Sequence, residues 1–122
     1  MKIRIKGNSL RYRLTKSEVE LFSKEGYLEE KTHFPSHVFT YALEAKKDIS
    51  ELQASYSNDK ISLFFPDSEK EKWFQSDQIG YESSMNLENE MTLKILVEKD
   101  FVCLDHIDED QSDNFPNPNL TC

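Results

Sequence analysis

The stretch Lys2-Ile-Arg-Ile-Lys-Gly-Asn-Ser-Leu-Arg-Tyr-Arg-Leu14 decides the fold of this chain. Two runs of alternating residues meet at Gly7-Asn8, and alternation on both sides of such a dipeptide is typical of a β-hairpin. Because successive side chains on a strand point to opposite faces, one face of the hairpin is predicted to be apolar and the other basic. The basic face carries five cations, which are Lys2, Arg4, Lys6, Arg11 and Arg13.

A short helix is predicted directly after the hairpin. Thr15-Lys-Ser-Glu18 has the pattern of a capping box, in which the Thr hydroxyl and the Glu carboxylate satisfy each other's backbone N–H groups. Gly26 is a suitable residue to end the helix. We expect its buried side to consist of Val19, Leu21 and Phe22.

The rest of the chain continues with strands and a second helix. Strands are predicted at residues 27–34, 36–45, 51–56, 60–65, 79–85 and 91–104. The strand at 36–45 is apolar on both faces, which favours a central position in its sheet. The second helix follows Pro66, with Ser68 and Glu71 as a second capping box and Trp73-Phe74 as its apolar anchor.

These elements predict an α+β fold. We expect a strongly curved, mainly antiparallel β-sheet or barrel of about eight strands with two short helices, since closure of a sheet removes its exposed edges. Open packing of the helices on one sheet face is the alternative. The order strand, strand, helix, strand, strand occurs twice at a shift of about 51 residues, which predicts a pseudo-two-fold repeat of topology.

Length and composition indicate one folded domain with a distinct tail. The 122 residues are 37% hydrophobic and 11% aromatic, which is unlike a disordered chain. We predict a single domain at residues 1–104. Residues 105–122 are acidic and rich in Pro and Asn, so they form a tail without regular structure that Phe115 attaches to the body.

The charge and hydropathy of the chain limit the classes of partner that it is expected to bind. A net charge of −8 argues against a general nucleic-acid binder. No apolar run reaches the roughly 20 residues that span a bilayer, and no signal peptide is recognisable, so we predict a cytoplasmic protein without a membrane partner. Residues 1–24 hold seven Lys or Arg against two Glu, whereas residues 98–122 hold seven Asp or Glu against Lys99. The oligomeric state is not predicted.

The basic hairpin face is the first candidate site. Arrays of Arg and Lys bind phosphate-rich ligands, and an acidic protein segment would meet the same charges. The alternative is a solvated face, or one neutralised by the acidic tail or by nearby carboxylates, namely Glu29, Glu30, Glu82 and Glu88. Barrel enzymes that bind triphosphates carry alternating acids on the first strand, and this first strand has none, which weakens a hydrolase interpretation.

A second candidate site lies near the C-terminus. Cys103, His106 and Cys122 are residue types that bind zinc, with Asp108 as a fourth ligand. The spacing lacks a paired C-x-x-C motif, and a free thiol at each cysteine, or a disulfide between them in an oxidising compartment, is the alternative.

The leading hypothesis is a small non-enzymatic binding or interaction protein, whose basic hairpin face meets an anionic ligand or an acidic partner. The rival hypothesis is an enzyme acting on a phosphorylated or nucleotide substrate within a barrel. With only three glycines, the chain has no P-loop and no dinucleotide fingerprint, and no cofactor is predicted. A buried cluster of cations beside carboxylates favours the enzyme, and an open basic face on the outside favours the binding protein.

Both ends of the chain resemble one family. The opening, KIRI-x-GNS-LR-x-RLT-x-SEV, is similar to the start of a family of small bacterial proteins that form a domain of unknown function. The tail from Glu109-Asp110 to Phe115-Pro-Asn-Pro118 is similar to that family's ending. The resemblance covers essentially the whole chain and implies a bacterial, cytoplasmic protein of about this size. It implies no functional residue.

Overall fold

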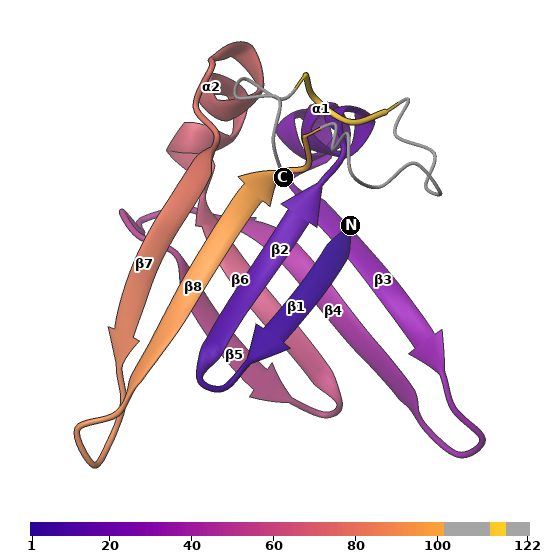
Figure 1. Cartoon of the computed structure of the whole chain (residues 1–122), viewed down its shortest axis with the longest axis vertical. Helices are drawn as coiled ribbons and strands as arrows, with labels where there is room; N and C mark the ends of the chain where they lie inside the picture. The colour runs from indigo at the N-terminus through magenta and orange to yellow at the C-terminus, as the bar shows by residue number, and fades with distance from the viewer. Residues whose placement is uncertain (102–112, 117–122) are drawn as a thin grey trace.

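Eight strands and two helices make up the computed structural model, which describes residues 1–101 and 113–116 (Figure 1). The α+β class, the two helices and the number of strands are as predicted. The elements in chain order are β1 (Lys2–Lys6), β2 (Ser9–Leu14), α1 (Lys16–Glu25), β3 (Tyr27–His33), β4 (Val38–Lys46), β5 (Gln53–Ser57), β6 (Lys60–Pro66), a 3₁₀ turn (Asp67–Glu69), α2 (Lys70–Gln75), β7 (Gly80–Asn86) and β8 (Thr92–Lys99).

The strands form two four-stranded sheets, one in the order β1-β2-β8-β7 and the other in the order β3-β4-β6-β5. Four of the strand pairs are antiparallel, but the central pair of each sheet, β2 with β8 and β4 with β6, is parallel. Over the described residues the strands thus divide into two sheets, and the predicted barrel is not confirmed. The expected interior strand, β4, does lie between two neighbours. The pseudo-two-fold repeat stays a prediction.

The hairpin of β1 and β2 forms as predicted. Ile3 lies opposite Tyr12 and Ile5 opposite Leu10, so the apolar side chains share the face that points toward the other sheet. Gly7 turns the chain with a φ of +53°, a conformation that glycine adopts without strain. Tyr12 and Leu14 are fully buried, whereas Ile5, near the turn, is 59% exposed.

The capping box at α1 is confirmed. The Thr15 hydroxyl accepts from the Glu18 N–H at 3.4 Å, and the Thr15 N–H donates to the Glu18 carboxylate at 2.9 Å. Gly26 ends the helix in the left-handed conformation, as expected. Val19 and Phe22 are buried, but the prediction for Leu21 was wrong, because this side chain is 46% exposed.

The prediction of a second capping box, formed by Ser68 and Glu71, was wrong. The residues after Pro66 first form the 3₁₀ turn, and α2 begins only at Lys70, with no side-chain cap. Ser68 therefore lies inside the turn rather than before the helix. A 3₁₀ turn at a helix start is common, and here it makes Glu69 rather than Ser68 the residue that precedes α2.

We expect Thr15→Ala to lower the free energy of unfolding by about 1 kcal/mol, because the substitution leaves the Glu18 N–H without its side-chain acceptor. Ser68→Ala is the matched control: Ser68 is exposed and caps no helix, so its loss should change stability by less than about 0.5 kcal/mol. Urea unfolding followed by circular dichroism measures both. Equal losses in the two variants would contradict the assigned caps.

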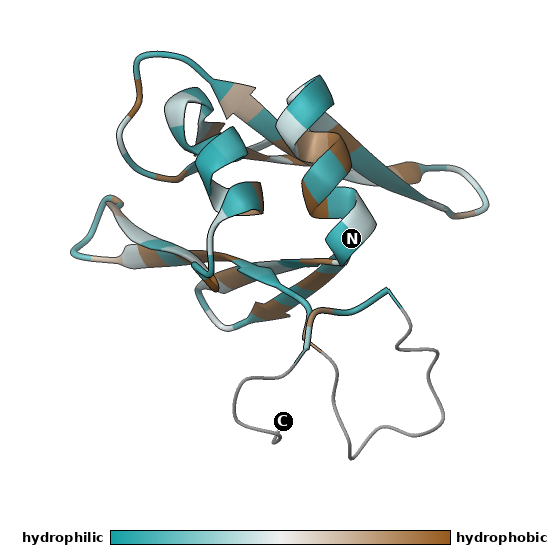
Figure 2. Ribbon diagram, turned by 90° about the horizontal axis from the view of Figure 1, so that it is seen from above, coloured by the Kyte–Doolittle hydropathy of each residue, from teal (hydrophilic) through white to brown (hydrophobic). Residues whose placement is uncertain are grey.

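The core lies between the two sheets, and the helices close one end of it. Seen from above, both helices lie between the two layers of strands (Figure 2). Phe65 lies at the centre of an aromatic cluster at this end of the core. Its ring packs edge-to-face on Phe22 at 5.3 Å and on Tyr81 at 4.8 Å, and it is tilted against Trp73 at 5.3 Å. The aromatic cluster fills the space that the two short helices leave between the sheets.

The described part of the tail contacts the body. The ring of Phe115 packs on Phe101 at 5.8 Å, and its N–H donates to the Asp100 carbonyl at 2.9 Å, which confirms the predicted attachment. Asp113 lies at the start of α1, where hydrogen bonds from Ser17, first of all, lower the pKa of its carboxyl. The predicted domain boundary at residue 104 lies outside the described residues.

Candidate functional site

The outer face of the sheet β1-β2-β8-β7 carries the five cations that the sequence singled out. Lys2, Arg4 and Lys6 come from β1, and Arg11 and Arg13 come from β2. Arg4 lies directly opposite Arg11, and Lys2 lies opposite Arg13, so the charges stand in adjacent positions across the pair. The apolar residues between them point to the core, and this alternation holds the cations on the solvent side.

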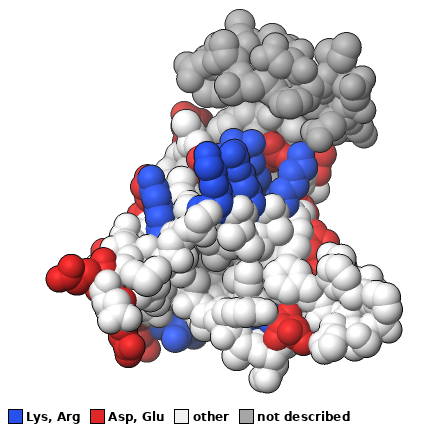
Figure 3. All heavy atoms as spheres, turned by 60° about the horizontal axis from the view of Figure 1, so that its bottom comes forward, with Lys and Arg blue, Asp and Glu red and all other residues white. Residues whose placement is uncertain are grey.

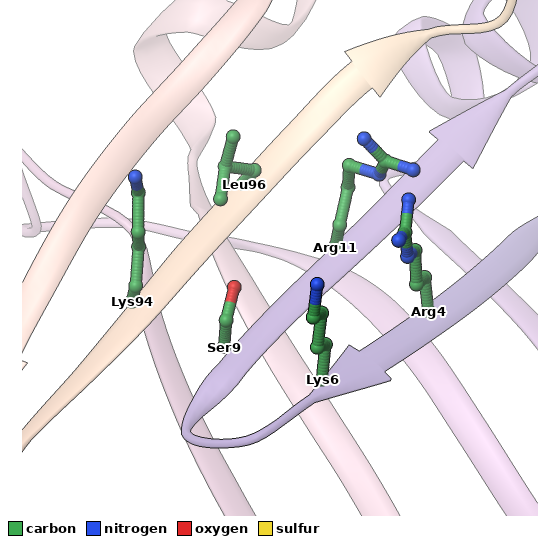
Figure 4. Close-up of a pocket in the computed structure, with 6 residues that line it drawn as sticks. All are labelled: Arg4, Lys6, Ser9, Arg11, Lys94 and Leu96. Atoms are coloured by element: carbon green, nitrogen blue, oxygen red, sulfur yellow. The ribbon is translucent and has the colours of Figure 1, made fainter.

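Strand β8 extends this face with residues that were not predicted to belong to it. In the parallel pairing, Lys94 lies opposite Ser9, Leu96 opposite Arg11 and Glu98 opposite Arg13. A hollow of about 170 Å³ forms between the hairpin and β8, and we call it the basic hollow (Figure 4). Its lining residues are Arg4, Lys6, Ser9, Arg11, Lys94 and Leu96.

Four cationic side chains stand at the sides of the basic hollow, and two smaller side chains lie between them. Figure 4 shows Arg4, Lys6 and Arg11 on one side and Lys94 on the other, with Ser9 and Leu96 between them. Ser9 offers a hydroxyl that can donate or accept a hydrogen bond. The hollow is thus lined by four cations and one hydroxyl, and by no carboxylate.

Carboxylates neutralise only part of the face. Glu98 accepts ion pairs from Arg11 at 3.6 Å and from Arg13 at 3.5 Å, and Asp100 pairs with Lys2 at 3.2 Å. Among the residues that the structure describes, Arg4 and Lys6 make no ion pair. These two cations are the ones nearest to the hairpin turn on β1, and both are exposed.

Of the four carboxylates expected to neutralise the face, only Glu82 forms an ion pair there, and Glu88 forms none among the described residues. Glu82 on β7 pairs with Lys94 at 3.2 Å. Glu29 pairs with Lys31 at 3.7 Å, and Glu30 pairs with the N-terminal amine at 2.8 Å. That amine also contacts Glu18, and the two carboxylates raise its pKa although its burial acts in the opposite direction.

The guanidinium of Arg11 is partly buried and lies among other charged groups. Its burial lowers its pKa, the neighbouring charge of Arg13 lowers the pKa further, and Glu98 opposes both effects. The Arg11 Nε and the Glu98 Oε1 are both buried and have no hydrogen-bond partner in the described structure. An anion in the basic hollow would relieve the repulsion between these arginines.

The predicted zinc ligands Cys103, His106 and Cys122, together with Asp108, lie outside the described residues. Within residues 1–101 and 113–116, no group of three or more His, Cys, Asp or Glu side chains is placed to hold a metal ion.

Lys94 is the site residue that sequence reasoning missed. The alternation of Lys94, Leu96 and Glu98 with buried residues was visible, so their common face was predictable. Their neighbour was not, because a parallel pairing between strands far apart in the chain leaves no local signal.

No helix in the described part of the chain has the length and apolar character needed to cross a membrane.

Comparison with known proteins places the chain in a family. No curated protein and no solved structure is similar enough to this chain to match it. The model of a family of unknown function matches residues 1–119, which is nearly the whole chain and agrees with the resemblance noted at both of its ends. The chain therefore belongs to the family of unknown function DUF7009.

Proposed function

We propose that this protein is a non-enzymatic binding protein whose basic hollow takes an oxyanion, such as the phosphate group of a small molecule or of an acidic partner. The observation that carries the proposal is the clustering of Arg4, Lys6, Arg11 and Lys94 around one hollow of about 170 Å³. Such clustering is unusual in a chain with a net charge of −8, because like charges brought together raise the energy of the folded state.

The donor set suits an oxyanion. Arginine presents N–H groups in a planar fork that matches phosphate and carboxylate oxygens, and lysine adds a point charge. Arg4 and Lys6 make no ion pair among the described residues, so they bind a ligand without first breaking a contact. Ser9 supplies a hydroxyl on the floor of the hollow, where it donates to one of the ligand oxygens.

The same lining favours binding over catalysis. General acid–base chemistry and divalent-cation binding both rely on side chains such as Asp, Glu or His within reach of the reacting group. None of these residue types lines the basic hollow. The hollow is also open on the outside of a sheet, whereas an enzyme site on a phosphorylated substrate was expected inside a closed barrel.

We expect tripolyphosphate, added at millimolar concentration in a buffer of low ionic strength, to raise the melting temperature by several degrees. Binding to the folded state alone adds about 2.7 kcal/mol at a ligand concentration of 100 times the Kd. Arg4→Gln combined with Lys6→Gln should remove most of this rise, since the two side chains supply the cations that are not already neutralised. Differential scanning fluorimetry or calorimetry measures the shift.

The matched control is Lys47→Gln combined with Lys72→Gln, which changes the net charge equally at two exposed positions away from the hollow. This variant should respond to tripolyphosphate like the parent protein. A parent protein whose melting temperature does not change, or a control variant that loses the response as fully as the Arg4/Lys6 variant, would refute the proposed site.

A further inference from the structure

A second depression lies on the other side of the hairpin tip, between the two sheets. We call it the apolar groove; it has a volume of about 410 Å³, within the range of about 300–1,000 Å³ typical of small-molecule pockets. Both sheets contribute to it, with Ile5, Leu10 and Leu93 from one, and Phe39, Tyr56 and Ile61 from the other. It opens at the end of the molecule where β2 begins, and both helices lie at the opposite end (Figure 1).

The groove leaves apolar side chains in contact with water. Ile5 is 59% exposed and Tyr56 is 68% exposed, although both stand on the core face of their strands. The helices and the aromatic cluster fill the space between the sheets only at their own end. Contiguous exposed apolar surface is typical of ligand-binding grooves and interaction sites.

The apolar groove and the basic hollow lie on opposite faces of the same sheet and meet at the hairpin tip. Ser9 lines both of them. The tip is held in place because the Asn8 side-chain amide donates to the Thr92 carbonyl at 2.8 Å, and the Lys94 N–H donates to the Asn8 carbonyl at 3.0 Å. Figure 3 shows a row of basic side chains directly beside a broad uncharged surface.

We propose that the two depressions bind one ligand, a single-chain anionic amphiphile. Its oxyanion head lies in the basic hollow and its alkyl chain passes the hairpin tip into the apolar groove. This inference rests on the proposed oxyanion site and adds the class of ligand to it. Charge complementarity selects this occupant. Lys6 and Lys94 both lie directly opposite Ser9, which also lines the groove, so an apolar chain carrying a negative end satisfies both surfaces.

The direct test compares three probes by isothermal titration calorimetry. Decyl phosphate, kept below the concentration at which it forms micelles, should bind with a stoichiometry of one and at least about tenfold more tightly than inorganic phosphate, because each methylene that enters the groove adds to the affinity. Decyltrimethylammonium has the same chain and the opposite charge, and it should bind at least about tenfold more weakly than decyl phosphate, because the cations repel it.

Two variants separate the two depressions. Ile5→Ser combined with Tyr56→Ser should reduce the affinity for decyl phosphate to that for inorganic phosphate, while the melting-temperature rise with tripolyphosphate is retained. Both positions are exposed, so the fold is expected to persist, and circular dichroism checks this. Ile79→Ser is the control, since Ile79 is 48% exposed and lies away from the groove, and it should leave decyl phosphate binding unchanged.

Each contrary result has a distinct meaning. If tripolyphosphate acts as expected but decyl phosphate binds no more tightly than inorganic phosphate, the proposed oxyanion site stands and the amphiphile inference fails. If both decyl compounds bind equally, the groove takes apolar chains without the hollow, and the inference fails again. A dimer in sedimentation velocity that the Ile5/Tyr56 variant dissociates would identify a second copy as the occupant. Binding to vesicles of anionic lipid, without binding to monomeric decyl phosphate, would identify a membrane surface.

Discussion

Replacing Trp73 with alanine is expected to lower the free energy of unfolding by about 3–5 kcal/mol. Trp73 is fully buried, and its ring contacts Phe65 at 5.3 Å and Tyr81 at 6.0 Å. It joins α2 to β6 and β7, so its removal leaves a cavity where the helix meets both sheets. Stability of a small domain is about 5–15 kcal/mol in total, so this single change removes a large share of it.

The measurement is urea unfolding followed by far-ultraviolet circular dichroism, because Trp73 is the only tryptophan and its fluorescence is lost with it. Trp73→Phe is the informative companion. The Trp73 Nε1 is buried and has no hydrogen-bond partner in the described structure, so phenylalanine removes an unsatisfied donor while keeping most of the ring contacts. A loss for Trp73→Phe as large as that for Trp73→Ala would contradict the assigned packing.

Gly80→Ala is expected to lower the free energy of unfolding by about 3 kcal/mol. This is the upper end of the range for adding a side-chain atom at a packed site, about 1–3 kcal/mol. A Cβ at Gly80 would lie 2.2 Å from the carbonyl oxygen of Val97 and 2.8 Å from the Cα of Glu98. Both obstacles are backbone atoms of β8, and no rotamer change can move them. The start of β7 must therefore separate from β8 if a methyl group is to fit.

Gly7→Ala is the control for this prediction. A Cβ at Gly7 meets no atom within 4 Å, so only its φ of +53° opposes the substitution. Such a conformation costs an alanine about 1–2 kcal/mol, which is less than the clash at Gly80. Thermal unfolding of the two variants ranks them directly, and the opposite order would show that β7 does not approach β8 as closely as described here.

Local patterns in the sequence predicted the elements well. The hairpin at residues 2–14 and the cap at Thr15 follow from turn chemistry and alternation over neighbouring residues, which act within a few positions along the chain. The predicted start of α2 was wrong because a 3₁₀ turn and an α-helix have similar local sequences, and α2 begins without a side-chain cap.

The arrangement of the strands depends on contacts that no local pattern reveals. The pairing of β2 with β8 and of β4 with β6 joins strands from different halves of the chain. For this reason the sequence could predict five cations on one face but could not show Lys94 beside them or Glu98 between two of them. The apolar groove was missed for the same reason, since its lining comes from both sheets.

The central parallel pairs also set how the chain reaches its folded state. Each sheet takes one hairpin from β1 to β4 and one from β5 to β8, so neither set of four strands contains a complete sheet. A nascent chain that has produced only β1 to β4 has edges without neighbours, and β2 gains its pair with β8 only after nearly all of the domain has been made. The β2–β8 pair joins strands near the two ends of the domain and so raises the contact order, and a high contact order slows folding.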